Sequence, residues 1–166
     1  MSGQRRVAVV TGAARGIGRG IGERLARDGY RVALWDLDLA GVTEVANAIT
    51  TAGGEAIARR VDVASAVEVR AGREGVLEAF GRMDVLVNNA GWDRYGWFLD
   101  TDEEYWDKVI GINYRGVLNT CRFLGRDISS ADAGRIINHR EAGFPAGGGV
   151  CGSQGGGHRV QPFACA

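Results

Sequence analysis

The sequence has little of what marks several classes of protein. Its 166 residues include only three cysteines, two prolines and one lysine, Lys108. Three irregularly spaced cysteines cannot form a disulfide scaffold, and no apolar run approaches the roughly 18 to 20 residues of a membrane span. Twenty basic side chains balance twenty acidic ones, so the chain lacks the basic footprint of a nucleic-acid binder and any polybasic membrane anchor. We expect a soluble, cytoplasmic chain without a signal peptide, whose partner is a small molecule.

Glycine, by contrast, is abundant, with 27 residues. Residues 139–166 contain eight of these glycines, both histidines, both prolines and two of the cysteines, but no Leu, Ile, Met, Lys, Tyr, Trp or Asp. A segment of this composition has no helical or strand periodicity and little to bury. We therefore expect residues 139–166 to be a disordered, non-native tail, and the folded domain to lie within residues 1–138.

Between residues 5 and 138, short β-branched runs alternate with longer amphipathic segments, as in a parallel sheet with crossover helices. Strands are expected at Arg6–Thr11, Arg31–Asp36, Ala56–Val61, Val85–Asn88 and Gly134–Asn138, and helices at Ile17–Asp28, Leu39–Ala52, Ser65–Phe80 and Asp102–Arg126. Gly29 suits the end of the first helix, and Ser65 with Glu68 forms a capping-box pattern. This order predicts an α/β fold, a Rossmann-like doubly wound parallel sheet that is incomplete because only its first five strands are present.

The segment from Thr11 to Gly18 (TGAARGIG) lies between a predicted strand and a predicted helix. Gly12 permits a tight turn there, and Gly16 and Gly18 let the backbone approach a pyrophosphate at the helix N-terminus. The strand–loop–helix context supports a dinucleotide site. A glycine-rich turn without a ligand is the alternative.

Asp36 ends the second predicted strand, 18 positions after Gly18. A carboxylate at about this spacing reaches the ribose 2′-hydroxyl of NAD and repels the 2′-phosphate of NADP. Arg15, inside the glycine loop, favours the opposite choice. We give Asp36 the greater weight, so NAD is preferred over NADP.

These motifs resemble those of the short-chain dehydrogenase/reductase family. The glycine loop is followed, in the family's order, by Asp62-Val63, by Asn88-Asn89-Ala90-Gly91 and by Asn113. The resemblance implies that Asp62 and Val63 contact the adenine, that Ala90 and Gly91 border the cofactor and that Asn89 braces the central strands. It also implies that Asn113 is the catalytic asparagine, which holds a proton-relay water. The full set of expected cofactor residues is Thr11, Gly12, Arg15, Gly16, Ile17, Gly18, Asp36, Asp62, Val63, Asn89, Ala90 and Gly91.

Within the family, the run Asn-Asn-Ala-Gly-Trp-Asp resembles alicyclic hydroxyacyl-CoA dehydrogenases such as 2-hydroxycyclohexanecarboxyl-CoA dehydrogenase, and next 3-oxoacyl-carrier-protein reductases. The resemblance implies an NAD-dependent oxidoreductase that interconverts a secondary alcohol and a ketone, with an acyl-CoA as one candidate substrate. It implies no metal. Family members form homo-oligomers through helices missing here, so we do not expect this chain to share their assembly.

The catalytic serine and the Tyr-x-x-x-Lys pair of the family are absent. No tyrosine follows Tyr114 and no lysine follows Lys108. In the family, that lysine lowers the tyrosine pKa so that the phenol exchanges a proton with the substrate oxygen. The chain as written is therefore expected to be inactive. The alternative, of a different class, is a dinucleotide-binding fragment or pseudoenzyme.

The tail has a further property at the level of codons. Residues 150–161 can be back-translated with permitted codons into a nucleotide sequence. When that sequence is read one nucleotide out of register, it begins with Tyr-Ala-Ala-Ala-Lys, which resembles the family's catalytic helix. We hypothesise that the chain is out of frame from about residue 139. A zinc site of His139, Cys151, His158 and Cys165 is the weaker interpretation, because no close-paired ligand spacing is present.

Aromatic residues gather after Gly91, at Trp92, Tyr95, Trp97, Phe98, Tyr105 and Trp106. They could line an apolar acyl pocket or serve core packing and a subunit contact. The sequence leaves both open.

Overall fold

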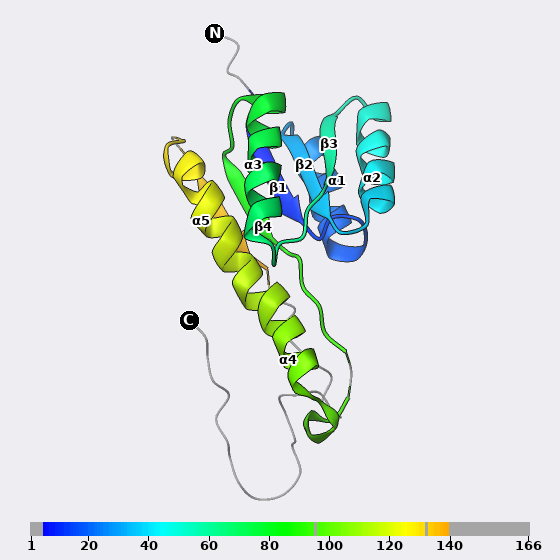
Figure 1. Ribbon diagram of the computed structural model, residues 1–166. Helices are drawn as coiled ribbons and strands as arrows, with labels where there is room; N and C mark the ends of the chain where they lie inside the picture. Colours follow the sequence, from blue (N-terminus) through cyan, green and yellow to red (C-terminus); the bar gives the residue numbers. More distant parts are fainter. Residues whose placement is uncertain (1–4, 95, 132, 140–166) are drawn as a thin grey trace, which may run out of the picture.

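The computed structural model describes residues 5–94, 96–131 and 133–139. Within these ranges five parallel strands form one sheet in the order β3-β2-β1-β4-β5 (Figure 1). The strands are β1 (Val7–Thr11), β2 (Arg31–Asp36), β3 (Glu55–Arg60), β4 (Val85–Asn88) and β5 (Arg135–Asn138). The helices are α1 (Gly16–Arg27), α2 (Leu39–Thr51), α3 (Ala66–Phe80), α4 (Glu103–Ile110) and α5 (Gly116–Ser129), with a 3₁₀ turn η1 (Phe98–Asp100) and a π turn η2 (Gly111–Arg115). The predicted Rossmann-like α/β fold is confirmed.

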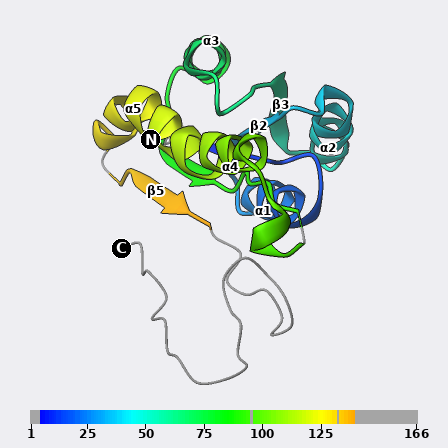
Figure 2. The same cartoon turned by 60° about the horizontal axis from the view of Figure 1, so that its bottom comes forward.

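Helices cover both faces of the sheet, as Figure 2 shows. Alternate residues of β1 divide between two cores, because side chains along a strand point to opposite faces. Val7 and Val9 pack with residues of α3 and α5, whereas Ala8 and Val10 pack with residues of α1 and α2. The three central strands β2, β1 and β4 are therefore buried on both sides, which explains their apolar runs.

The strand order reverses between β1 and β4. From β1 the sheet grows through β2 to β3 in one direction, and through β4 to β5 in the other. In open parallel sheets, ligands bind outside the carboxyl ends of the strands at such a switch point. The loops after β1 and β4 both begin at this edge, so a ligand site is expected there.

The predicted glycine at the end of α1 and the predicted Ser65 cap at the start of α3 are both confirmed. The capping box at Ser65, however, has only one of its two hydrogen bonds. Gly29 has a φ of +90° after α1, and the Ser65 hydroxyl accepts a hydrogen bond from the Glu68 N–H at 3.3 Å. The Glu68 carboxylate, however, does not return to Ser65. It accepts from the Asp62 N–H at 2.9 Å and from the Arg60 guanidinium at 2.7 Å, so it ties α3 to the end of β3 instead.

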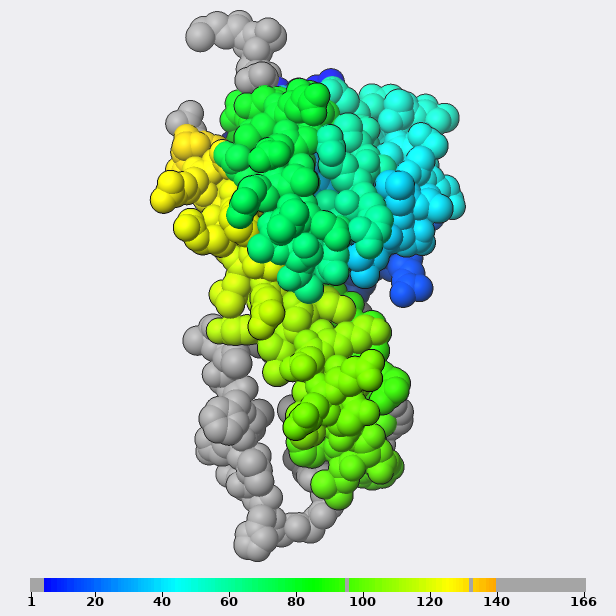
Figure 3. All heavy atoms as spheres, viewed as in Figure 1, coloured from blue at the N-terminus to red at the C-terminus, as the bar shows by residue number. Residues whose placement is uncertain are grey.

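The single helix predicted at 102–126 is wrong in detail. The structure has α4, then the π turn η2, then α5, which ends at Ser129. Together they form one long rod, whose α4 end stands away from the sheet in Figure 1 and projects from the rest of the described residues in Figure 3. A π turn inserts about one extra residue into the helix, which a 3.6-residue apolar period does not reveal.

At the edge of the sheet, all four residues of β5 are exposed, including Ile136 and Ile137.

Among the described residues, no helix is long and apolar enough to cross a membrane, and no three His, Cys, Asp or Glu side chains gather as a metal site. The predicted glycine-rich tail, its reading-frame shift and the alternative zinc ligands fall outside the described residues, except for His139.

Candidate cofactor-binding site

The loop after β1 has the backbone form that its glycines permit. Gly12 and Gly16 have φ values of +66° and +55°, a region that side chains other than glycine rarely adopt. A Cβ on Gly18 would overlap the Gly12 carbonyl oxygen, so α1 can lie this close to the loop only with glycine there. A Cβ on Gly16 would meet nothing within 4 Å. The space above Gly16 is therefore open to a ligand.

The N-terminus of α1 differs from those of the other helices that follow loops. Asp38, Ser65 and Asp102 cap α2, α3 and α4 with side-chain oxygens. In the described part of the chain, α1 has no such cap and no acidic residue in its first turn. Its first N–H groups thus lack side-chain acceptors, and no carboxylate within the first turn offsets the positive end of the helix dipole. This end of α1 suits an anion such as a pyrophosphate.

Asp36, at the end of β2, lies against this loop. One carboxylate oxygen accepts from the Ala14 N–H at 3.0 Å, and the other accepts from the Asp38 N–H at 3.0 Å. These bonds hold the negative charge beside the glycine loop. Arg15 lies in the same loop, directly before α1, and its side chain is exposed.

The turn after β4 is fastened to the end of β1. The Asn89 amide donates to the carbonyls of Thr11 and Gly12 at 3.0 and 3.1 Å. The buried Thr11 hydroxyl accepts from the N–H groups of Asn89 and Ala90, each at 3.0 Å. The glycine loop and the Asn89–Gly91 turn therefore lie side by side at the switch point.

Asp62 and Val63 follow β3 at the same edge. The Asp62 carboxylate accepts from the Ala64 N–H at 2.9 Å, which forms a local turn. Val63 is buried against Gly116, and its carbonyl accepts from the Asn119 amide at 2.8 Å. These contacts explain the shape of the turn, and the contact of either residue with an adenine stays a prediction. Asn119 was not anticipated from the sequence, because nothing in a helical period marks which polar residue turns inward.

Asn113 lies in η2, next to the Asn89–Gly91 turn. Its side chain accepts from the Trp92 N–H at 2.8 Å and donates to the Trp92 carbonyl at 3.0 Å. Both ends of the amide are therefore engaged by backbone, and the expected hold on a water stays a prediction. The immediate effect is to fix the segment after Gly91 to the π turn.

Tyr95 lies outside the described residues, and the other aromatic residues expected between Gly91 and Trp106 separate into two groups. Trp92 and Tyr105 pack together at 5.5 Å, and the Lys108 ammonium lies 3.9 Å from the Trp92 ring centre. The buried Tyr105 hydroxyl donates to Asp93; this hydrogen bond, with burial and the Asp93 charge, raises the pKa of Tyr105 above its ordinary value. The second group points outward, and Trp97, Phe98 and Trp106 are all exposed.

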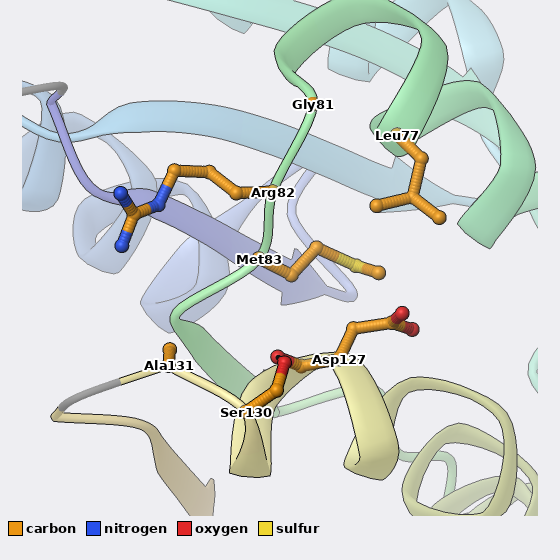
Figure 4. A pocket seen from close by; sticks show the side chains of 7 residues that line it. All are labelled: Leu77, Gly81, Arg82, Met83, Asp127, Ser130 and Ala131. Carbon is orange, nitrogen blue, oxygen red and sulfur yellow. Dashed lines mark hydrogen bonds between the residues drawn. The ribbon is translucent and has the colours of Figure 1, made fainter.

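A cavity of about 320 Å³ lies at the opposite edge of the sheet (Figure 4). Met83 and Ala131, which lie just before β4 and β5, line it. Its polar side chains already have partners, since Asp127 binds Arg73 and the Ser130 hydroxyl donates to the Asp127 carbonyl. This cavity is remote from the glycine loop and offers a ligand few free groups.

A glycine loop and an uncapped helix N-terminus at the switch point of a parallel sheet define a Rossmann-like α/β protein of the dinucleotide-binding kind. The family model described as short chain dehydrogenase matches residues 6–140. The chain belongs to the short-chain dehydrogenase/reductase family, whose members are oxidoreductases.

Relatives of this family match over most of the chain. It is 40% identical over 134 residues to an uncharacterized oxidoreductase of Methylorubrum extorquens, covering 80% of this chain and 53% of the relative. It is 42% identical over 135 residues to the short-chain reductase protein NovJ of Streptomyces niveus, covering 81% and 52%. For the 3-oxoacyl-[acyl-carrier-protein] reductase FabG of Staphylococcus aureus the identity is 41% over 135 residues, covering 79% and 54%. The chain thus spans about half the length of these relatives.

Solved structures agree with this assignment. A short-chain dehydrogenase/reductase of Burkholderia phymatum in complex with NAD is 32% identical, with a TM-score of 0.78 over 83% of this chain and 50% of that chain. A metagenomic short-chain oxidoreductase in complex with NADP is 40% identical, with a TM-score of 0.76 over 80% and 61%. The neighbours therefore include both NAD and NADP complexes.

Proposed function

We propose that this chain binds a nicotinamide dinucleotide at the carboxyl edge of the sheet, with the pyrophosphate on the N-terminus of α1. The observation that carries the proposal is the uncapped first turn of α1 beneath the open, positive-φ glycine at Gly16. Thr11 and Asn89 support the loop from below through their hydrogen bonds. When bound, the nicotinamide would donate or accept a hydride, and the protein would supply position and charge.

We propose NAD as the preferred cofactor. The Asp36 carboxylate is held by two backbone N–H groups, so it cannot easily turn away from a 2′-phosphate placed beside it. Arg15 is the feature that favours NADP. Its side chain is exposed and makes no hydrogen bond that caps α1. Exposed Ile17 and Leu37 add apolar surface next to the loop, against which a nucleotide could pack.

The protein from which this chain derives is proposed to interconvert a secondary alcohol and a ketone, in line with its family. The chain as written lacks the tyrosine and lysine that the family uses for the proton transfer, since no tyrosine follows Tyr114 and no lysine follows Lys108. We propose that residues 1–138 are the cofactor-binding half and that residues from about 139 are read out of frame. Asn113 is the one member of the expected catalytic set that remains, and its bonds to Trp92 give it a positioning role.

One pair of assays separates an active oxidoreductase from a binding fragment. NADH fluorescence titration reports binding, and a turnover assay with secondary alcohols and NAD, or ketones and NADH, reports chemistry. Saturable binding without turnover supports the binding fragment. Turnover would contradict the claim that the chain lacks its acid–base groups, and absence of binding by a folded chain would contradict the cofactor proposal. Independent resequencing of the gene tests the frame, and an intact frame encoding this tail would refute the shift.

A further inference from the structure

Arg60 is a cation beside the proposed cofactor site. It ends β3 as Asp36 ends β2, and the two residues are register partners in the sheet. Neighbouring strands lie about 4.8 Å apart, and partners on parallel strands leave the sheet on the same face. The backbone of Arg60 is therefore adjacent to that of Asp36, whose carboxylate lies against the glycine loop.

The preceding residue, Arg59, points the other way. Side chains alternate between the two faces along a strand. The Arg59 guanidinium lies over Gly75 of α3, where a Cβ on Gly75 would overlap it. The Arg60 side chain is 53% exposed at the end of the edge strand β3. Of these two arginines, only Arg60 is placed to act at the carboxyl edge beside Asp36.

Arg60 is paired with Glu68 and not with its neighbour Asp36. The Arg60 guanidinium donates to the Glu68 carboxylate, in the first turn of α3, at 2.7 Å. Among the ion pairs of the described residues, none joins Arg60 to Asp36. The same Glu68 oxygen accepts from the Asp62 N–H at 2.9 Å, which fixes it to the turn after β3. Glu68 thus holds the Arg60 guanidinium away from Asp36.

This pairing determines the charge at the edge. Asp36, Arg60 and Glu68 together carry a net negative charge, which disfavours a second anion nearby. Without Glu68, the Arg60 guanidinium would offset the charge of Asp36. It would also offer several N–H donors to a phosphate, a group that arginine binds well.

We propose that the Arg60–Glu68 pair is a second determinant of cofactor choice. Glu68 engages Arg60 and so keeps the site selective for NAD over NADP. Arg60 is the group that would bind a 2′-phosphate, and Glu68 is a positioning residue that acts through Arg60. This inference rests on the proposed dinucleotide site and adds residues outside the glycine loop and Asp36 to its selectivity.

Glu68→Gln tests the inference in the full chain. Glutamine keeps an oxygen for the Asp62 N–H but loses the charge that holds Arg60. The affinity for NADPH relative to NADH, measured by fluorescence titration, should rise about three- to fivefold, as expected when an exposed ion pair is lost. Glu55→Gln is the matched control, because Glu55 binds Arg5 at 2.7 Å but begins the same strand, at the opposite edge of the sheet. It should leave the ratio unchanged.

The double variant Glu68→Gln/Arg60→Gln distinguishes this role from a structural one. Its ratio should return to the wild-type value, because the gain passes through Arg60. The gain of Glu68→Gln should also shrink when the salt concentration is raised to about 0.5 M, because exposed charges are screened. Urea unfolding confirms that each variant folds, and Glu68→Ala replaces Glu68→Gln if that variant does not.

An unchanged ratio in the folded Glu68 variant would overturn the inference. So would a gain that persists in the double variant, or an equal gain in Glu55→Gln, because Arg60 would then not be responsible. A wild type that binds neither dinucleotide would refute the proposed function as well. NADH binding with a ratio that Glu68→Gln does not change would refute the role of the pair alone.

Discussion

The side-chain amide of Asn113 is paired with the backbone of Trp92 in both directions. It accepts from the Trp92 N–H at 2.8 Å and donates to the Trp92 carbonyl at 3.0 Å. The π turn that carries Asn113 is thus fastened to the segment that leaves the Asn89–Gly91 turn. Asn113, the residue expected to hold a catalytic water, therefore also fixes a loop at the carboxyl edge of the sheet.

Replacing Asn113 with alanine should lower the free energy of unfolding by about 1 kcal/mol, since two partly exposed hydrogen bonds are lost. Urea unfolding measures this change. Asn47→Ala is the control, because Asn47 is exposed on α2, and it should have little effect. Equal stability of the Asn113 variant and the wild type would show that the pairing with Trp92 contributes nothing.

Two glycines of α1 should respond in opposite directions to the same substitution. Gly18→Ala should cost at least about 2 kcal/mol, because the new methyl group would overlap the Gly12 carbonyl. Gly20→Ala should stabilise by about 0.5 to 1 kcal/mol, because nothing lies within 4 Å and alanine favours the helix. Thermal or urea unfolding compares the two variants. A Gly18→Ala protein as stable as the wild type would contradict the close approach of loop and helix.

Removing the charge of Asp36 should change the choice between cofactors. Asp36→Asn keeps an oxygen that can accept one of the two backbone hydrogen bonds but no longer repels a 2′-phosphate. The affinity for NADPH relative to NADH should rise about tenfold, measured by fluorescence titration. Asp28→Asn, at the far end of α1, should leave the ratio unchanged. An unchanged ratio in the Asp36 variant would assign the selection to another residue.

The buried Asp84 carboxyl should make the free energy of unfolding depend on pH. Burial alone would raise the pKa of this carboxyl, but hydrogen bonds from Arg82 and the Val7 N–H and the charges of Arg82 and Arg6 outweigh it, so its pKa is lowered. A lowered folded pKa stabilises the protein above the unfolded value of about 3.9, and this contribution is lost as pH falls through 3.9 towards the folded pKa.

Asp84→Asn should therefore cost about 2 kcal/mol at pH 7, and the gap from the wild type should narrow below about pH 4. Urea unfolding at pH 7 and at pH 3 measures this gap. Asp107→Asn is the control, because Asp107 is exposed and, among the described residues, takes part in no ion pair. A gap that stays constant with pH would mean that the Asp84 charge is not what stabilises the fold.

Local signals explain why much of the fold was predictable. The limits of β2 and β4 agree with the prediction, because turn residues bound each apolar run on both sides. The long helix at 102–126 was predicted, but the π turn within it was not, because it disturbs the period by too little to be visible. The destination of Glu68 was also missed, since its distance to the end of β3 is set by the tertiary fold and not by sequence spacing.

For the candidate site, the position of the glycine loop was predictable from the sequence, but the arrangement of the aromatic side chains was not. Glycine positions and the order of motifs located the loop, because their spacing follows from backbone geometry. The partition of the aromatic residues was not predictable, since Tyr105 and Trp106 are neighbours in sequence but face opposite ways. In the described structure, Trp92 packs against Tyr105 in the loop after Gly91. The side chains of Trp97, Phe98 and Trp106 are exposed instead, so the described aromatic residues do not line one apolar pocket.

The uncapped N-terminus of α1 is proposed to bind the cofactor pyrophosphate. Isothermal titration of NADH into the wild type, Ile17→Asp and Ile17→Asn tests this binding mode, because a carboxylate in the first turn stabilises a helix but repels a bound anion. We expect Ile17→Asp to be at least as stable as Ile17→Asn and yet to bind NADH at least tenfold more weakly. Equal NADH affinity of these two folded variants would refute the proposal, since the anion would then not lie on α1.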